Sequence, residues 1–502
     1  MGVMRFEFHP PELLDGWPEI HRAFLRGFDG RVYPTRVEVD GNVMICRRQE
    51  FESGKLNVAW PVEGFGRPIV SSCSLIEREE PYLLSLELAR GKISQLRDQV
   101  GAWETTGLQI SDEFQALATE VHRLFARAVT SQNRPAEASE LACAALQKAF
   151  EASQLIVQNY TQQRLAIRRL RSPRLPASLG CFLGYSLLDD ARTNEQFCEA
   201  FNAAAIPVEW RHIEPAEGES HWDVNDAQIE WCQKQRLLMY GGPLLDFSSE
   251  GLPDWLCQWE NDFLNLKSLF SDFVETAISR YFGKIRIWEI SARANTGGAL
   301  ALNEENRLAL VAHTLDVARQ VDEEIQLMIR IDQPWGDYLA RGQHRLSPLQ
   351  FVDALLRSGI GLSGVNLEIS IGYRPRGCGC QDLMEFSRLI DLWSQLEIPL
   401  YVTLAFPTAD GVDANSQTDL EVDSPCCGQP WSEASQLDWV NEFFPLLLAK
   451  ESVVGIYWTH FTDATPHDFP HAGLVRPDGT PKSTLNQFVQ YRRNFWDTPL
   501  DQ

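Results

Sequence analysis

The chain has 502 residues and a formal net charge of -24 at pH 7, which argues against nucleic acid or an anionic membrane as a partner and favours a neutral ligand. No run approaches the roughly 18 apolar residues of a membrane span, and residues 1–14 lack the apolar core of a signal peptide. The eleven cysteines form a scattered, odd set that is typical of reduced thiols. We therefore expect a cytoplasmic protein, long enough for a barrel of about 250 to 330 residues and an appendage.

Residues 1–80 are expected to form a small antiparallel β unit. Short strand-like segments alternate with turn signals such as the Gly-Asn pair at 41–42; the segments are 5–8, 32–39, 43–48, 56–62 and 69–76. Tyr33, Trp60 and Phe65 either pack in the core of this unit or act as stacking platforms for a sugar. The core interpretation is favoured, because large aromatic side chains usually serve to fill a small core.

Residues 81–174 change to a helical period and are expected to form a bundle. Apolar residues recur at spacings of three and four over 82–103, 112–130 and 136–170. Ser111 and Pro135 are suitable residues for helix starts. The Ser172-Pro173 pair then ends the last helix and marks a domain boundary.

Residues 175–502 alternate short apolar runs with amphipathic segments eight times, which predicts an α/β fold of the (β/α)8 TIM-barrel type. The expected strands are 179–186, 203–209, 236–243, 285–290, 325–331, 364–369, 399–405 and 453–459. Helices are expected between them, at 194–200, 224–234, 253–282, 306–321, 348–358, 382–396, 432–450 and 482–495. In such a barrel, the functional residues follow the carboxyl ends of the strands.

The second and third of these strands carry a spaced set of residues that resembles family 10 glycoside hydrolases, the xylanase family. The set comprises Phe201-Asn202, Trp210, Glu214-Pro215, Gly218, Asp226 and the later Leu252-Pro253-Asp254-Trp255. This resemblance implies a carbohydrate-active protein with a TIM barrel. It covers most of residues 175–502 and none of the first 170 or so.

The positions that hold the family's two catalytic glutamates differ here. The match places Arg293 at the general acid/base and Leu404 at the nucleophile, with Glu209 at a conserved lysine position and Glu368 on the sixth strand. A retaining glycosidase needs two carboxyl groups about 5 to 5.5 Å apart. Leucine cannot form the glycosyl ester, and an arginine that stays charged is a poor proton donor or acceptor.

Other polar residues at the strand ends could take over this chemistry. The candidate replacements for the catalytic acids are Glu209, Asp332 and Glu368. The candidate substrate-binding residues are Trp210, Asp246, Arg293, Trp335, Asp337, Tyr338, His460 and Asp463. Carboxylates beside aromatic rings suit a sugar, because acids accept hydroxyl hydrogen bonds while a ring stacks on the sugar's C–H face. Taken singly, each acid is better explained as an ion-pair partner of Arg293 or Arg330, or as a loop cap.

Two groups of potential metal ligands occur in the barrel loops. Cys378, Cys380, Cys426 and Cys427 would make a structural zinc site if the loops met, but their spacing favours ordinary loop thiols. His467 and His471 have zinc-like spacing, although flanking prolines disfavour the helix that usually presents such a pair, so exposed loop histidines are the simpler interpretation. We therefore expect neither a metal nor a cofactor.

Three functions remain open from the sequence. The first is hydrolysis of a glycoside through relocated carboxylates. The second is a non-catalytic relative that binds a saccharide or serves as a scaffold after losing both glutamates. The third is barrel chemistry unrelated to sugars. Two facing carboxyl groups across a cleft would favour the first, whereas a cleft closed by Arg293 and its partners would favour the second. The sequence does not indicate the oligomeric state.

Overall fold

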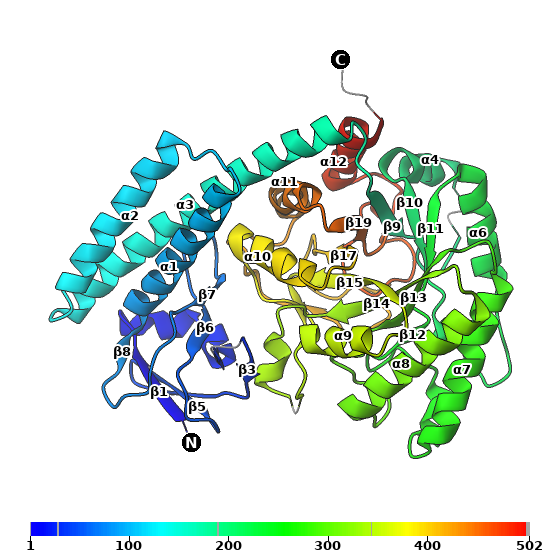
Figure 1. Ribbon diagram of the computed structural model, residues 1–502, viewed down its shortest axis with the longest axis horizontal. Helices are drawn as coiled ribbons and strands as arrows, with labels where there is room; N and C mark the ends of the chain where they lie inside the picture. The colour runs from blue at the N-terminus through cyan, green and yellow to red at the C-terminus, as the bar shows by residue number, and fades with distance from the viewer. Residues whose placement is uncertain (1, 28–29, 188–189, 343, 498–502) are drawn as a thin grey trace.

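The larger part of the molecule is built around a closed ring of parallel strands with eight strand positions (Figure 1). The computed structural model describes residues 2–27, 30–187, 190–342 and 344–497. The barrel strands are β9 (Ser178–Phe182), β10 (Ala203–Ile206), β11 (Leu238–Gly241) with its continuation β12 (Leu245–Asp246), β13 (Ile287–Ala292), β14 (Gln326–Asp332), β15 (Leu362–Ser370), β17 (Leu400–Ala405) and β19 (Val453–Trp458). Pairing of β11 with β13 closes the ring, so the predicted TIM barrel is confirmed.

Helices surround the barrel between successive strands, as the alternating sequence pattern predicts. They are α4 (Ala191–Ala200), α5 (Trp210–Ile213), α6 (Asp223–Gln235), α7 (Phe263–Arg280), α8 (Glu304–Val321), α9 (Pro348–Arg357), α10 (Leu383–Ser394), α11 (Glu433–Ala449) and α12 (Ser483–Arg492). The predicted helix 253–282 is divided. A short 3-10 helix (Asp254–Trp259) precedes α7, and the Asp262 side chain caps α7 by accepting a hydrogen bond from the Asn265 backbone.

The barrel interior is partly aromatic. Phe182, Tyr240, Tyr401 and Tyr457 gather inside the ring. A much larger apolar cluster fills the space between the strands and the outer helices. Since side chains alternate between the two faces of a strand, each barrel strand contributes to both layers.

The first part of the chain forms two four-stranded sheets. Their strands are β1 (Gly2–Glu7), β2 (Phe24–Arg26), β3 (Val32–Tyr33), β4 (Arg36–Asp40), β5 (Val43–Arg48), β6 (Lys55–Ala59), β7 (Ile69–Ser71) and β8 (Tyr82–Leu83). Trp60 is buried and meets Trp17 edge to face, while Tyr33 is also buried. The β-unit aromatics Trp60 and Tyr33 are therefore core residues.

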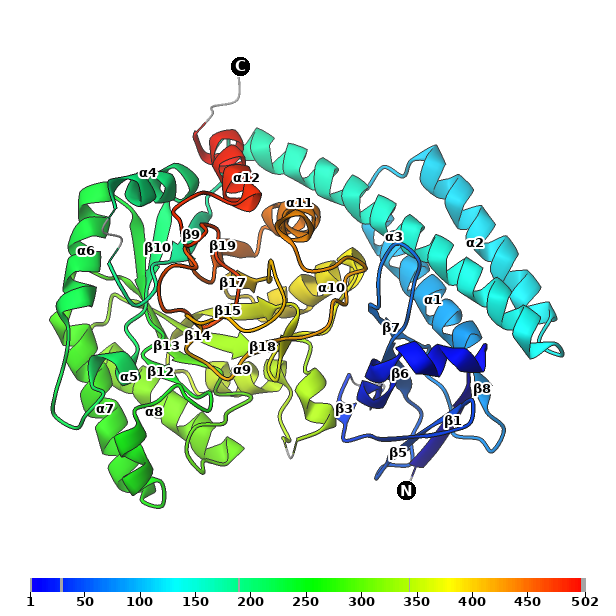
Figure 2. The same ribbon diagram turned by 180° about the vertical axis from the view of Figure 1, so that it is seen from behind.

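Three helices, α1 (Leu84–Thr105), α2 (Asp112–Thr130) and α3 (Pro135–Arg171), connect the β unit to the barrel. The helix starts predicted at Ser111 and Pro135 are confirmed. One buried cluster joins the sheets to α1 and α3, and α3 also runs beside α10 and α11 of the barrel (Figures 1 and 2). Among the helices of the described residues, none is both long enough and apolar enough to cross a membrane.

Candidate functional site

Arg293 occupies the mouth of the barrel, directly after β13, and has a left-handed backbone with φ 58°. Its Nε and Nη2 donate to the two oxygens of Glu368 at 3.0 and 2.8 Å, and its Nη1 donates to Asp246 at 2.6 Å. All three side chains are buried. A two-pronged guanidinium-carboxylate pair is a strong and directional contact, so Arg293 cross-links β12 and β15 through their acids.

A second buried arginine lies beneath the first. Arg330 of β14 pairs with Glu289 at 2.6 Å and reaches Glu368 at 3.3 Å. Asn366 donates to Glu289 at 2.7 Å and also hydrogen-bonds to Thr403. Desolvation raises the pKa of Glu289 despite the nearby guanidinium. Glu368 and Asp246 are therefore held in an ion-pair network with buried arginines. This agrees with the interpretation of each single acid as an ion-pair partner.

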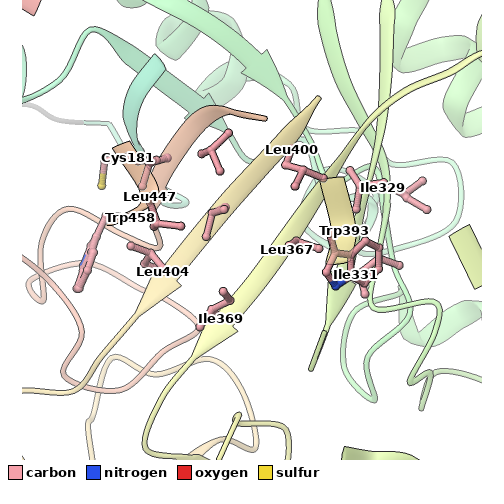
Figure 3. Packing of buried hydrophobic residues seen from close by; sticks show 14 of the residues in the cluster. Cys181, Ile329, Ile331, Leu367, Ile369, Trp393, Leu400, Leu404, Leu447 and Trp458 are labelled. Carbon is pink, nitrogen blue, oxygen red and sulfur yellow. The ribbon is translucent and has the colours of Figure 1, made fainter. Parts of the chain in front are cut away.

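The end of β17 carries no carboxylate toward this network. Leu404 belongs to the apolar cluster outside the strands and lies beside Leu447 and Trp458 (Figure 3). Thr403 instead points into the barrel, where it meets Asn366, and Ala405 packs against Phe469 at the mouth. The sequence match placed Leu404 at the position of the nucleophile. In the structure Leu404 faces outward, and its neighbours Thr403 and Ala405 face the barrel interior and mouth. Neither of them has the carboxylate needed for a glycosyl ester.

Glu209 lies across the mouth, immediately after β10. The Tyr185 hydroxyl is 3.1 Å from Glu209 Oε1 and 3.0 Å from Asp468 Oδ1. Burial, reinforced by the charge of Asp468, raises the pKa of Glu209 to about 8. Although burial opposes it, the charge of Arg211 keeps the pKa of Asp468 below its ordinary value. At neutral pH, therefore, Glu209 is protonated and Asp468 is the anion.

Asp332 is the last residue of β14 and is fully buried. Its Oδ2 accepts hydrogen bonds from Thr296 at 3.2 Å and from Gln333 at 3.3 Å. Burial and then the charge of Glu368 raise its pKa to about 7. The three acids that the sequence singled out thus lie around one mouth, two with raised pKa values and one bound by two arginines.

The space between these groups is small. The cavity bounded by Tyr185, Glu209, Arg330 and Asp468 has a volume of about 30 Å³. Phe469 contributes to its wall and lies with its ring centroid 5.7 Å from the Arg293 guanidinium carbon. One water needs roughly 10–15 Å³, whereas ligand pockets measure roughly 300–1,000 Å³. The cavity beside Glu209 therefore has room for water but not for a sugar ring.

Two predicted aromatic contacts lie elsewhere. Trp210 is buried in the core, stacked on Phe273 at 4.8 Å, and its Nε1 donates to Glu214. Trp335 packs against Phe386 of α10. The rings of Trp210 and Trp335 are thus engaged by the protein itself. The xylanase-like motif around Trp210 serves packing in this chain.

His460 and Asp463 follow β19 and form a buried cluster. His460 Nε2 lies 3.2 Å from Asp463 Oδ1, and Lys482 lies 2.7 Å from Asp463 Oδ2. Burial lowers the pKa of His460 to about 4. Although burial opposes it, hydrogen bonding from His460 and the charge of Lys482 hold the pKa of Asp463 well below its ordinary value. This cluster ties the last loop to the start of α12.

The two histidines with zinc-like spacing meet a carboxylate. His467 Nε2 and His471 Nδ1 lie 3.0 and 3.5 Å from the same Asp413 oxygen, and His467 Nδ1 lies 2.8 Å from the Thr465 carbonyl. His467 also stacks on His460. His467 is buried, so the expectation of an exposed loop histidine is wrong for it. Both of its ring nitrogens already have protein partners.

A larger groove lies outside the mouth, between the barrel loops and the β unit. Its volume is about 570 Å³, and it is lined by Asp337 and Tyr338 after β14, by Tyr373 after β15, and by Arg22 and Phe24 of the β unit. The Tyr338 hydroxyl accepts a hydrogen bond from Asn295 at 3.2 Å. Of the predicted substrate-binding residues, Asp337 and Tyr338 thus lie together in a space large enough for a ligand.

Sequence reasoning missed several members of these sites. Tyr185 and Asp468 complete the Glu209 cluster, and Arg22 and Phe24 complete the groove. Tyr185 follows β9, so its place at a strand end was a usable signal. The β-unit residues gave no such signal, because nothing local indicates against which barrel loop they pack.

Comparisons with known proteins agree with the barrel fold and with the resemblance to family 10 glycoside hydrolases. The model of glycosyl hydrolase family 10 matches residues 178–365. Endo-1,4-beta-xylanase B of Thermotoga neapolitana is 21% identical over 313 residues, covering 57% of this chain and 86% of the relative. Endo-1,4-beta-xylanase 3 of Hypocrea jecorina is 26% identical over 266 residues, covering 50% and 73%. The solved xylanase 10B of Thermotoga petrophila RKU-1, in complex with xylobiose, is 16% identical with a TM-score of 0.48, covering 65% of this chain and 97% of that one.

The class that these findings support is a xylanase-like (β/α)8 barrel, similar to glycosyl hydrolase family 10. The resemblance predicted from the sequence is therefore confirmed. The family match begins at residue 178, so the β unit and the helices α1 to α3 lie outside it.

Proposed function

We propose that this protein is a non-hydrolysing relative of the family 10 xylanases, and that it binds a neutral oligosaccharide in the groove between the barrel and the β unit. The observation that carries the proposal is Arg293, whose guanidinium holds Glu368 and Asp246 across the barrel mouth. Glycoside cleavage requires two carboxyl groups that face each other across the sugar. Here a buried cation fills the space between two such groups.

Hydrolysis through relocated carboxylates is the less favoured function. Glu209 and Asp332 have the raised pKa values of general acids. The cavity beside Glu209 nevertheless measures only about 30 Å³, and a general acid must come within hydrogen-bonding distance of the leaving oxygen. A sugar could enter only if Phe469 and its loop moved aside, which would also uncover the Arg293 network.

The groove offers the chemistry that a neutral sugar needs. Tyr338 lines the groove, although its ring also meets His344 edge to face at 4.9 Å, and Gln333, Asp337 and Arg341 supply acceptors and donors around it. The oligosaccharides to test first are derived from xylan, because the curated relatives are endo-1,4-beta-xylanases and one solved structure of similar fold holds xylobiose. The net charge of -24 also favours an uncharged ligand.

Calorimetric titration with xylobiose and longer xylo-oligosaccharides should give binding without turnover. Tyr338→Ala should weaken that binding about 5-fold, since loss of one stacking ring is worth about 1 kcal/mol, whereas Tyr338→Phe should retain most of it. Phe51→Ala, which removes an exposed ring in the β unit, is the matched control and should bind as the wild type does.

Chromatography of the incubated sugars checks for cleavage. Release of shorter xylo-oligosaccharides by the wild type, but not by Glu209→Gln, would contradict the proposal and support hydrolysis. Equal affinity in Tyr338→Ala and the wild type would place the ligand outside the groove. If no sugar of a broad glycan array binds the wild type, the proposed function is wrong.

A further inference from the structure

Three of the four loop cysteines come together beside the β unit. Cys380 follows the short strand β16 (Tyr373–Arg374), and Cys426 and Cys427 follow β18 (Glu421–Val422). Cys427 Sγ lies 3.1 Å from Cys380 Sγ and 3.7 Å from Cys426 Sγ, and all three sulfur atoms lie within 4.8 Å of one another. None of the three is in a disulfide. Two loops that are far apart in the sequence thus present three thiols to one point.

The fourth cysteine of the predicted set is not part of this cluster. Cys378 is buried, and its Sγ lies 3.9 Å from the carbonyl oxygen of Glu368, to which it donates. Its place is therefore beneath the barrel mouth. Of the four cysteines considered in the sequence as a zinc site and interpreted there as ordinary loop thiols, three thus lie together, which leaves one coordination position to be filled from elsewhere.

The backbones of the three cysteines are fixed by the β unit. Arg67 donates its backbone N–H to the Cys426 carbonyl at 2.8 Å, and Ile69 donates to the Cys380 carbonyl at 2.9 Å. Gly66, with φ 74°, approaches so closely that a Cβ there would lie 2.2 Å from the backbone nitrogen of Gly428. Because these contacts together hold both loops, the sulfur atoms are placed by the fold and not by their own attraction.

The arrangement suits a tetrahedral soft-metal site. Zinc-thiolate bonds of about 2.3 Å at the tetrahedral angle place two sulfur ligands about 3.8 Å apart. The observed separation of 3.7 Å between Cys426 and Cys427 matches this value, and the 3.1 Å contact of Cys380 needs to open by well under one ångström. Structural zinc sites usually have four protein ligands, whereas sites with three protein ligands bind water in the fourth position. Three sulfur ligands and one water would therefore complete a tetrahedral site here.

The open side of the cluster is acidic. A cavity of about 140 Å³ is lined by Cys380 and Cys427 together with Asp382, Asp438 and Glu442, and its described lining includes no lysine or arginine. Asp382 is paired with Lys92, and Glu442 accepts a hydrogen bond from Gln154 at 2.9 Å. A cation bound by the sulfur atoms would be stabilised by the negative charge on this side of the cluster, and water would complete its coordination.

We propose that Cys380, Cys426 and Cys427 form a zinc site that fixes the two barrel loops against the β unit. Each thiol that binds zinc gives its proton to solvent, and no oxidation or reduction takes place. The proposal does not depend on the proposed sugar binding. The zinc ion would lie at the junction between the barrel and the β unit. Zinc binding should therefore stabilise the docking of the β unit on the barrel.

The metal content of the reduced full-length protein tests the site. After treatment with a chelator and exposure to zinc, elemental analysis should find one zinc per chain. Cobalt in place of zinc should give strong near-ultraviolet charge-transfer absorption from thiolate ligands. Cys380→Ser and Cys427→Ser should each weaken zinc binding at least 100-fold, whereas Cys378→Ser and Cys257→Ser, which lie outside the cluster, should retain it.

Hydrogen exchange in the wild type tests the role at the junction without any variant. Zinc should slow exchange of the backbone N–H groups of residues 66–71 at least tenfold relative to the chelated protein, while exchange in α8 stays unchanged. The proposal is overturned if the reduced protein binds no stoichiometric zinc, if both cluster variants keep it, or if mass analysis of protein kept under reductant finds Cys380 and Cys427 joined as a disulfide.

Discussion

Replacing Arg293 with methionine should lower the free energy of unfolding by about 3–5 kcal/mol, because loss of one partner leaves buried charges without compensation. Glu368 would lose two hydrogen bonds and Asp246 the guanidinium that lies 2.6 Å away, while both side chains stay inside the barrel mouth. Methionine is shorter than arginine but unbranched and flexible, so it limits any cavity. Urea unfolding at pH 7, followed by tryptophan fluorescence, measures the change.

Two further variants make this test specific. Arg357→Met removes an exposed arginine that pairs with Asp353 at 2.8 Å, and it should change stability by no more than about 0.5 kcal/mol. Adding Glu368→Gln to Arg293→Met should recover about 1–2 kcal/mol, since it removes one of the two buried carboxylates that lost Arg293 as a partner. A loss below about 1 kcal/mol for Arg293→Met would show that the guanidinium does not hold the mouth together.

The architecture of the barrel could be predicted because each strand and helix is indicated by residues within its own segment. Apolar runs mark the strands, and helix starts carry their own caps, as at Ser111, whose hydroxyl accepts from the Phe114 backbone. The division of the predicted helix 253–282 was missed, although Asp262 is a good capping residue. An internal cap in a continuous apolar pattern is easily taken for a polar residue on a helix surface.

The chemistry of the mouth depends on contacts that no local pattern records. Arg293 meets Asp246 and Glu368, which are 47 and 75 residues away in the sequence. The outward direction of Leu404 follows from the pleat of β17, and a shift of one residue reverses it. The sequence could therefore place the right residues at the strand ends, but it could not tell a catalytic pair from an ion-pair network.

The junction with the β unit shows the same limit on a larger scale. Asp337 and Tyr338 were predicted to contact a ligand at the mouth, and they instead face Arg22 and Phe24 across the groove. The docking of one structural part on another buries surfaces that each part carries separately. The groove and the thiol cluster both arise at that docking surface, so neither could be assembled from motifs within the barrel alone.

The pH dependence of stability should depend strongly on Glu209. The pKa of this buried carboxyl is about 8 in the folded protein, against an ordinary value of 4.5. Between these two values the folded state holds a proton that the unfolded state has released, so stability falls as the pH rises through that window and levels off above it. Glu209→Gln cannot titrate. It should therefore gain about 3 kcal/mol relative to the wild type between pH 5 and pH 8.5.

The charged and titratable groups around Glu209 are Tyr185, Arg211, His212 and Asp468, with smaller effects from Asp246 and Arg293. Burial lowers the pKa of His212 to about 4, which makes stability rise with pH at the acidic end of the range. The pKa of Asp332 is raised to about 7, so Asp332, like Glu209, makes stability fall as the pH rises. Both contributions remain in the variant, so they largely cancel when the two stability curves are subtracted.

Urea unfolding of the wild type, Glu209→Gln and Glu275→Gln at half-unit pH steps measures this difference. Glu275 is exposed on α7, and its variant should run parallel to the wild type at every pH. Parallel curves for Glu209→Gln as well would mean that the carboxyl is ionised in the folded protein. In that case the Tyr185 hydroxyl would have to satisfy two carboxylates with one proton, and the mouth would need a cation or a water chain beyond Arg211 to hold them.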